Sequence, residues 1–142
     1  LLAKEGLNAV VSSGGLLPRN ARPSPAPALE AAARAGVDLA MHRSSHAHLQ
    51  SLEAADVIVI FDHINHRALC ERYPALAERA VCLGSYGEPE LAEIADPDGQ
   101  PLAEFEVNYR AIDQCLVGLV RSLRRLATSQ EIHAETGHAH TS

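Results

Sequence analysis

The segment Val57–Phe61 constrains the fold of this chain more than any other stretch of the sequence. It is a continuous run of five apolar residues, Val-Ile-Val-Ile-Phe, with an aspartate on each side. A short run without polar alternation is typical of a strand that is buried on both faces of a parallel sheet. Asp62 follows the strand directly and is suited to cap a helix from His63 to Tyr73, which Pro74 ends. The run therefore predicts a strand followed by a helix.

Strands and helices alternate along the rest of the chain in the same way. Two further strands are predicted at Leu7–Val11, where Val10 and Val11 are β-branched, and at Arg79–Leu83. Further helices are predicted at Ala28–Ala35 (ended by Gly36), Leu49–Ala55 and Ala111–Leu126, the last with apolar residues at intervals of three and four. This alternation predicts an α/β fold with a parallel sheet flanked by helices.

Length and composition narrow the class of protein. The 142 residues suit one domain, which we expect to span residues 1–127, with a disordered tail from Thr128 to Ser142 that has little apolar content. The net charge of −6 argues against a nucleic-acid partner, and no apolar run approaches the length of a membrane span. Three cysteines, a sparse and odd number, suit a reducing compartment, so we expect a cytoplasmic protein.

The stretch Asp96-Pro97-Asp98-Gly99 is the strongest candidate for chemistry. Proline fixes its own φ and keeps the preceding residue out of the helical region, so Asp96 should lie in a rigid loop. A carboxylate held in a loop is what a general acid requires. An ordinary surface turn is the alternative interpretation of the same four residues.

A histidine cluster and a Cys-x5-Arg-Ser spacing resemble functional motifs, but their surroundings argue against a functional site. The histidines of Met41–His48 lack a neighbouring Cys, Asp or Glu to complete a metal site, so we expect them to bond to nearby backbone, and no metal is predicted. Cys115, Arg121 and Ser122 form a Cys-x5-Arg-Ser spacing, which can mark a phosphate-binding loop. The residues between them belong to the apolar stripe of a helix, however, so this match is interpreted as coincidental.

The order of several motifs resembles the low-molecular-weight protein tyrosine phosphatase family. The residues that carry the resemblance are Val11-Ser12-Ser13-Gly14, Gly36-Val37-Asp38, Met41-His42-Arg43, Asp56–Asp62, Asn65, Leu83-Gly84-Ser85-Tyr86, Asp96-Pro97, Phe105-Glu106 and Tyr109. The likeness covers residues 1 to about 126 and is most specific from Asp56 to Tyr109.

The resemblance implies a phosphatase I-like fold and hydrolysis of a phosphate monoester, with protein phosphotyrosine or a small phosphate ester as substrate. In the family a cysteine attacks the phosphoryl group, an arginine binds its oxygens, and an aspartate before proline protonates the leaving group. Asp96 matches that general acid, whereas His42 and Ser12 match residues that support the phosphate loop. No cofactor is implied.

The sequence departs from the family pattern in two places. Asp98-Gly99 stands where members often have aromatic residues, which leaves selectivity for an aryl substrate open. The first, central strand and its Cys-x5-Arg loop are absent, so we expect a truncated copy of an enzyme that is inactive alone. In the family that strand separates the counterparts of Leu7–Val11 and Val57–Phe61.

Two alternatives to the truncated enzyme stay open. The first is a non-catalytic binding or regulatory module on the same fold. The second is a thiol-dependent arsenate reductase, which needs relay cysteines near Phe61-Asp62, whereas Cys70 lies eight residues further on, in the predicted helix.

Overall fold

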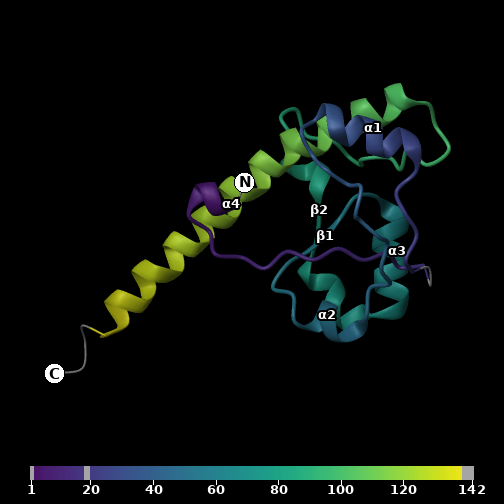
Figure 1. The fold of residues 1–142 in the computed structure, drawn as a ribbon. Coiled ribbons are helices and arrows are strands. Elements are labelled where there is room, and N and C mark those ends of the chain that lie inside the picture. Colours follow the sequence, from purple (N-terminus) through teal and green to yellow (C-terminus); the bar gives the residue numbers. More distant parts are fainter. Residues whose placement is uncertain (1, 18–19, 139–142) are drawn as a thin grey trace.

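A two-stranded parallel sheet lies at the centre of the structure (Figure 1). The computed structural model describes residues 2–17 and 20–138. Strands β1 (Ile58–Ile60) and β2 (Ala80–Cys82) pair in register, with Ile58 opposite Ala80 and Ile60 opposite Cys82. The connection between them runs through α3 (His63–Arg72) and the 3-10 helix η2 (Pro74–Arg79). The parallel sheet and the α/β class predicted from the sequence are confirmed.

The other helices surround this unit. Their bounds are η1 Leu2–Glu5, α1 Ala26–Arg34, α2 Leu49–Glu53, η3 Leu83–Tyr86 and α4 Leu102–His138. The helices predicted at Ala28–Ala35 and Leu49–Ala55 are therefore confirmed within two residues at each end. Asp62 caps α3 as predicted, because its side chain accepts a hydrogen bond of 2.7 Å from the backbone N–H of Asn65.

Three apolar clusters form the core. Ile58 and Ile60 of β1 pack against Leu69 of α3 and Leu76 of η2. The second cluster joins η3 to α4 through Leu83, Ile94, Cys115 and Leu119. The third cluster joins α1 to α4 through Ala28, Ala31 and Phe105.

Only one face of β1 is buried, which differs from the prediction of burial on both faces. Ile58 and Ile60 are each 8% exposed, whereas Val59 and Phe61 are each 37% exposed. The reason is the two-residue period of a strand, which turns Val59 and Phe61 away from α3 and η2. An apolar strand is therefore buried on both faces only where another element packs on each face.

The strand predicted at Leu7–Val11 is wrong. The segment is extended, but within the described part of the chain it pairs with no strand. Val10 is 100% exposed and Val11 75% exposed. β-branched residues favour a strand, yet a strand forms only where a partner completes its hydrogen bonds.

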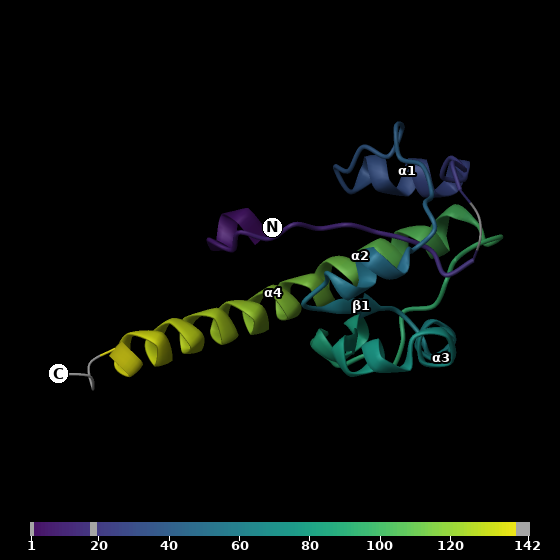
Figure 2. The same ribbon diagram turned by 90° about the horizontal axis from the view of Figure 1, so that it is seen from below.

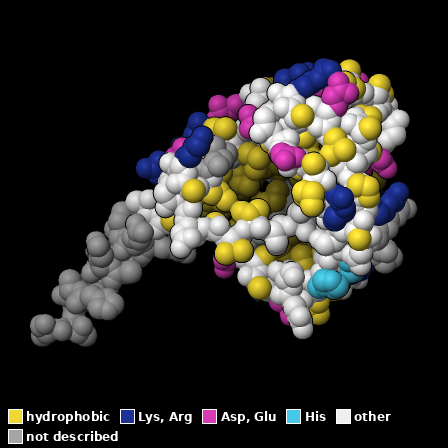
Figure 3. Space-filling view, viewed as in Figure 1, with side chains coloured by type: hydrophobic (Ala, Val, Ile, Leu, Met, Phe, Trp, Pro, Cys, Tyr) yellow, Lys and Arg dark blue, Asp and Glu magenta, His cyan; other side chains and the backbone are white. Residues whose placement is uncertain are grey.

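A hollow lies where such a partner would fit. Figure 2 shows the extended segment running past the sheet without joining it, and Figure 3 shows a hollow lined by hydrophobic side chains between this segment, α4 and the strands. Further along, the chain is tied to a loop, since the Gly15 N–H donates to the Ser45 carbonyl oxygen and the Ala47 N–H to the Gly15 carbonyl oxygen. The extended segment is therefore anchored at its far end but open along its length.

Helix α4 is longer than predicted at both ends. It begins at Leu102, nine residues before the predicted start, and continues to His138, although disorder was expected from Thr128. Glu131, Ala134 and Glu135 are good helix formers, and no proline interrupts residues 128–138, which allows the backbone to stay helical. Residues 139–142 of the expected tail lie outside the described residues.

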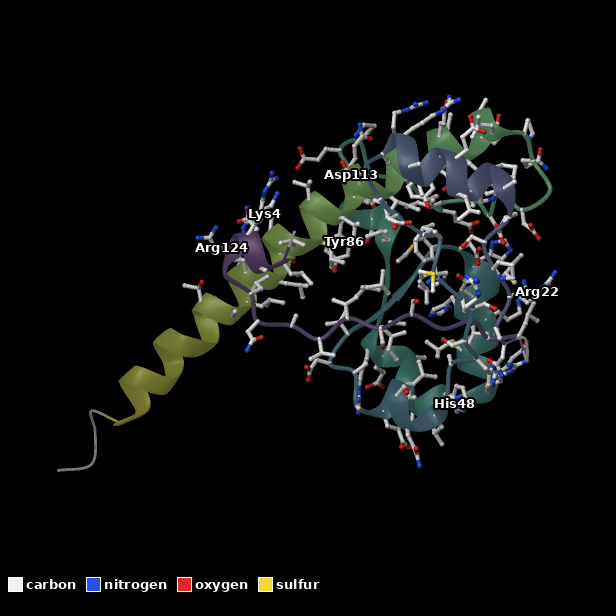
Figure 4. The ribbon with its side chains drawn as sticks, viewed as in Figure 1. Lys4, Arg22, His48, Tyr86, Asp113 and Arg124 are labelled. Atoms are coloured by element: carbon white, nitrogen blue, oxygen red, sulfur yellow. The ribbon has the colours of Figure 1, made fainter. Side chains whose placement is uncertain are left out.

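The second half of α4 extends away from the rest of the molecule (Figures 1 and 2). It meets η1, where Arg124 Nη1 donates to Glu5 Oε2 at 3.0 Å, and Figure 4 shows Arg124 beside Lys4 of η1. No helix among the described residues combines the length and apolarity that crossing a bilayer would require.

Candidate active site

Asp96 lies in the connection between η3 and α4, and the residues before it are firmly tied. The Ile94 side chain is buried, 4% exposed, and its backbone N–H donates to the Phe61 carbonyl oxygen at 2.9 Å. The next carbonyl oxygen, that of Ala95, accepts a hydrogen bond from Asn108 Nδ2 at 2.5 Å. The acid loop, residues 94–100, is thereby fixed to the end of β1 and to α4.

The turn predicted after Asp96 is confirmed. The Gln100 N–H donates to the Pro97 carbonyl oxygen at 2.9 Å, and Gly99 has φ +77°, a left-handed value that glycine adopts readily. Asp96 Oδ1 accepts the Asp98 N–H at 3.0 Å, which orients the carboxylate. Within the described residues no hydrogen bond engages Asp96 Oδ2, and the side chain is exposed.

Asp96 borders a pocket of about 460 Å³ at the end of β1. Its apolar wall consists of Phe61 from β1's end, Ile94, and the α4 residues Phe105, Tyr109 and Ile112. Burial raises the pKa of the Tyr109 hydroxyl above its ordinary value of 10.0, so this group stays a neutral hydrogen-bond donor at neutral pH. An apolar wall with a polar rim suits a small molecule that has an apolar part and a polar end.

Polar side chains form the rim of the pocket. The carboxylates of Asp62, Asp96 and Asp98 lie there together with the amides of Asn65 and Asn108. Asp62 is occupied in capping α3, so Asp96 and Asp98 are the carboxylates available to a bound molecule. Of these two, Asp96 is the one whose oxygen is oriented by a loop hydrogen bond.

Ser12 and His42 lie apart from this pocket, and neither side chain lines it. Both are exposed, and within the described residues no hydrogen bond engages either side chain. Their segments are nevertheless neighbours, because Ser45 Oγ donates to the Ser13 carbonyl oxygen at 3.0 Å. The structure thus brings the Ser12 and His42 segments together but does not join them to Asp96.

One of the three histidines of Met41–His48 contacts backbone as the sequence indicated. The ring Nδ1 of His46 lies 3.1 Å from the Leu17 carbonyl oxygen, and its ring meets that of His48 edge-on, with 5.6 Å between centroids. Among the side chains that the structure describes, no group of three or more His, Cys, Asp or Glu could hold a metal ion.

Comparison with known proteins now gives the family. Residues 1–129 match the family described as low molecular weight phosphotyrosine protein phosphatase. The chain belongs to this family. A curated relative, the probable low molecular weight protein-tyrosine-phosphatase EpsP of Ralstonia nicotianae, is 29% identical over 116 residues, which are 82% of this chain and 78% of the relative. The resemblance inferred from the sequence motifs is therefore confirmed.

Solved structures show the same fold at low sequence identity. A YwlE mutant from Bacillus subtilis has a TM-score of 0.78 at 21% identity and covers 87% of this chain and 82% of its own. The YwlE arginine phosphatase from Geobacillus stearothermophilus has a TM-score of 0.76 at 22% identity, covering 93% and 84%. Vibrio vulnificus Wzb in complex with benzylphosphonate has a TM-score of 0.75 at 23% identity, covering 85% and 84%.

The cysteines of this phosphatase-family chain are not placed as nucleophiles. Cys115 is buried in α4 with an exposure of 0%, and burial, followed by the neighbouring Cys82, raises the pKa of its thiol. A nucleophile needs a lowered pKa, so the interpretation of the Cys115–Ser122 spacing as coincidental is supported. Cys70 lies on α3 and Cys82 on β2, away from any Cys-x5-Arg run.

Sequence reasoning missed Asn108, although it singled out Phe105 and Tyr109 of the pocket wall. Asn108 shares one face of α4 with Phe105 and Ile112, and all three line the pocket. A polar residue inside an apolar stripe was the available signal, but the helix was predicted to begin only at Ala111.

Proposed function

We propose that this protein hydrolyses protein phosphotyrosine through a cysteinyl-phosphate intermediate, with Asp96 as general acid and then general base. The observation that carries the proposal is the Asp96 carboxylate, oriented by the Asp98 N–H on the rim of an apolar pocket. In the first step a thiolate attacks phosphorus, the bond from phosphorus to the phenolic oxygen breaks, and Asp96 donates its proton to that oxygen. In the second step Asp96 takes a proton from water as the water oxygen attacks phosphorus and the P–S bond breaks.

In this proposal the thiolate belongs to a segment that contains none of Cys70, Cys82 and Cys115. We place it on a strand and Cys-x5-Arg loop that would lie in the hollow between residues 7–14 and β1. The edge of β1 that is unpaired among the described residues supports this placement, since an inserted strand would complete its backbone hydrogen bonds. The side chains of that strand would also lie beside Val59, which is 37% exposed. The loop after that strand would start at the edge of the sheet where β1 ends, near Phe61 and the pocket.

Ser12 and His42 take supporting roles in this proposal. Their segments are held together by the bonds between Ser13, Gly15 and Ser45. A phosphate-binding loop in the hollow would find a hydroxyl and an imidazole there to bond to its backbone. The free thiols of the chain suit a reducing cytoplasm.

A non-catalytic role is the second candidate, and one observation favours it. The only Cys-x5-Arg-Ser spacing in the 142 residues lies inside α4, where the thiol is buried. A chain that never acquires a nucleophile loop would present the acidic pocket only for binding.

The experiment compares two proteins in hydrolysis of nitrophenyl phosphate. The first is the 142-residue chain, and the second is the same chain joined to the residues encoded upstream of Leu1. We expect only the longer protein, which includes the upstream residues, to hydrolyse nitrophenyl phosphate. Turnover by neither would leave the binding role, and turnover by the first would show that one of its own cysteines is the nucleophile.

Replacing Asp96 by asparagine in the active protein tests the role of the carboxylate. Asn cannot donate the proton, so kcat should fall by roughly 10²–10⁴-fold for phenyl phosphates of high leaving-group pKa. The loss should be smaller for nitrophenyl phosphate, and KM should change little. Identical slopes of kcat against leaving-group pKa in both proteins would make Asp96 a turn residue only.

A further inference from the structure

The contact between Asn108 and the acid loop has no part in the chemistry described so far. Asn108 is half-buried in α4, and its Nδ2 donates to the Ala95 carbonyl oxygen at 2.5 Å. Among the described residues this is the one side-chain hydrogen bond that ties residues 94–100 to another element. Only the amide nitrogen can face a carbonyl oxygen favourably, so the orientation of the Asn108 side chain follows from its partner.

The bonded carbonyl is the one that controls the backbone of Asp96. It belongs to the peptide unit between Ala95 and Asp96, and this unit is planar. Fixing the carbonyl oxygen therefore fixes the orientation of the peptide N–H and the Cα of Asp96. Pro97 restricts the backbone on the other side of Asp96. The Asp98 N–H then holds one carboxylate oxygen at 3.0 Å.

Helix α4 is a rigid base for this contact. Phe105, three residues before Asn108, is buried against Ala28 and Ala31 of α1. Cys115, seven residues after it, is buried against η3 in a separate cluster. Because α4 is packed one turn before Asn108 and two turns after it, Asn108 cannot follow the loop if the loop moves.

We propose that Asn108 is a positioning residue. It holds the Asp96 carboxylate at the place on the pocket rim from which it can reach a leaving-group oxygen. The inference rests on the proposed function of Asp96 as general acid. Asn108 acts through the Ala95–Asp96 peptide and does not itself transfer a proton. Its importance follows from the steep dependence of catalysis on position, since a displacement of about 1 Å can cost about 10²-fold.

The direct test uses the 142-residue chain and needs no activity. Asn108→Leu keeps the branching and number of side-chain heavy atoms but removes the donor. Asn108→Ala is a second variant, for the case that the larger leucine side chain disturbs folding. The Asp98 amide reports on the loop because it is bonded to Asp96 Oδ1. Loss of one hydrogen bond should speed its hydrogen exchange by roughly 5–10-fold. Val107→Ala, on the neighbouring residue that is 52% exposed, is the matched control and should leave the exchange unchanged.

The consequence for catalysis is measured in the active protein that includes the upstream residues. We expect Asn108→Leu to lower kcat about 10-fold for phenyl phosphates of high leaving-group pKa and less than 3-fold for nitrophenyl phosphate, with KM unchanged. In an Asp96→Asn background the same change should cost nothing further, because the group it positions is gone. A purely structural role would lower kcat equally in both backgrounds and for both substrates.

The outcomes separate this inference from the proposed function. Unchanged Asp98 exchange in both Asn108 variants would overturn the inference, as would losses that add fully to that of Asp96→Asn. Faster exchange in a protein that shows no turnover even with its upstream residues would support the contact as the anchor of the loop and refute the proposed function instead.

Discussion

Gly118, in the middle of α4, should be a position where the usual effect of a glycine-to-alanine change is reversed. Inside a helix this change ordinarily stabilises by about 1 kcal/mol. Here a Cβ built on Gly118 would overlap the Tyr86 carbonyl oxygen of η3 and lie 3.0 Å from the carbonyl carbon. Normal carbon contacts are about 3.5–4.0 Å, so α4 and η3 would have to separate by roughly 1 Å.

The separation would loosen the cluster on the same face of α4. Cys115 and Leu119, on the turns beside Gly118, are 0% and 5% exposed and pack on Leu83 and Ile94. Overpacking costs roughly 1–3 kcal/mol, and the upper end applies because the obstacle is backbone that cannot rotate away. After the gain in helix propensity, we expect a net loss of about 2 kcal/mol, which corresponds to about 30-fold faster opening.

Hydrogen exchange of the α4 amides is the assay, because it reports local opening without requiring a two-state melt. Figure 4 shows Asp113 on α4, and this residue is exposed. Asp113→Ala is therefore the control, in which helix propensity acts alone and should slow exchange slightly. If Gly118→Ala also slows exchange of the amides from Cys115 to Val120, the close approach of α4 to η3 is not as described and the reasoning is refuted.

Three further predictions concern the sheet, a buried thiol and a helix cap. The 142-residue chain alone should melt broadly and associate at micromolar concentration, and Val59→Lys should reduce the association seen by sedimentation; a monomer with a sharp two-state melt would contradict this. Burial raises the pKa of the Cys115 thiol above its ordinary value of 9.0, so the stability that this thiol contributes is present below pH 9 and falls as pH rises further; Cys115→Ala should reduce that fall, measured by unfolding against pH, and leave the part due to Tyr109, whose pKa burial also raises. Asp62→Ala removes the cap at Asn65 and should cost about 1 kcal/mol, and no change in the exchange of the first α3 amides would count against the cap.

Local signals were enough to predict the central unit of the fold. The run Val57–Phe61, the cap at Asp62 and the strand at Arg79–Leu83 each depend on residues close in sequence, and β1, α3 and β2 follow them closely. Leu7–Val11 could not be predicted correctly, because its state depends on a partner strand and not on its own residues. The prediction that Val59 is buried was wrong for the same reason. An apolar pattern shows which side chains favour burial, but not whether another element packs over them.

In the acid loop, too, the sequence predicted the local structure but not the long-range contacts. Pro97 and Gly99 indicated a turn around Asp96, and the turn is present. The ties that hold it, from Ile94 to Phe61 and from Asn108 to Ala95, span 33 and 13 residues and leave no local signature. The early start of α4 could not be predicted from a stripe whose clearest repeats begin at Ile112.

The hydrogen bond from the Ile94 N–H to the Phe61 carbonyl oxygen makes the acid loop and the open side of the sheet thermodynamically linked. Phe61 directly follows β1, and a chain that pairs with β1 would restrain it. If such pairing favours the bonded position of the loop, then by reciprocity the bonded loop strengthens the pairing by the same factor. Ligands that order Asp96 should therefore tighten the hold of this protein on a strand in the hollow, even though they touch no residue of that strand.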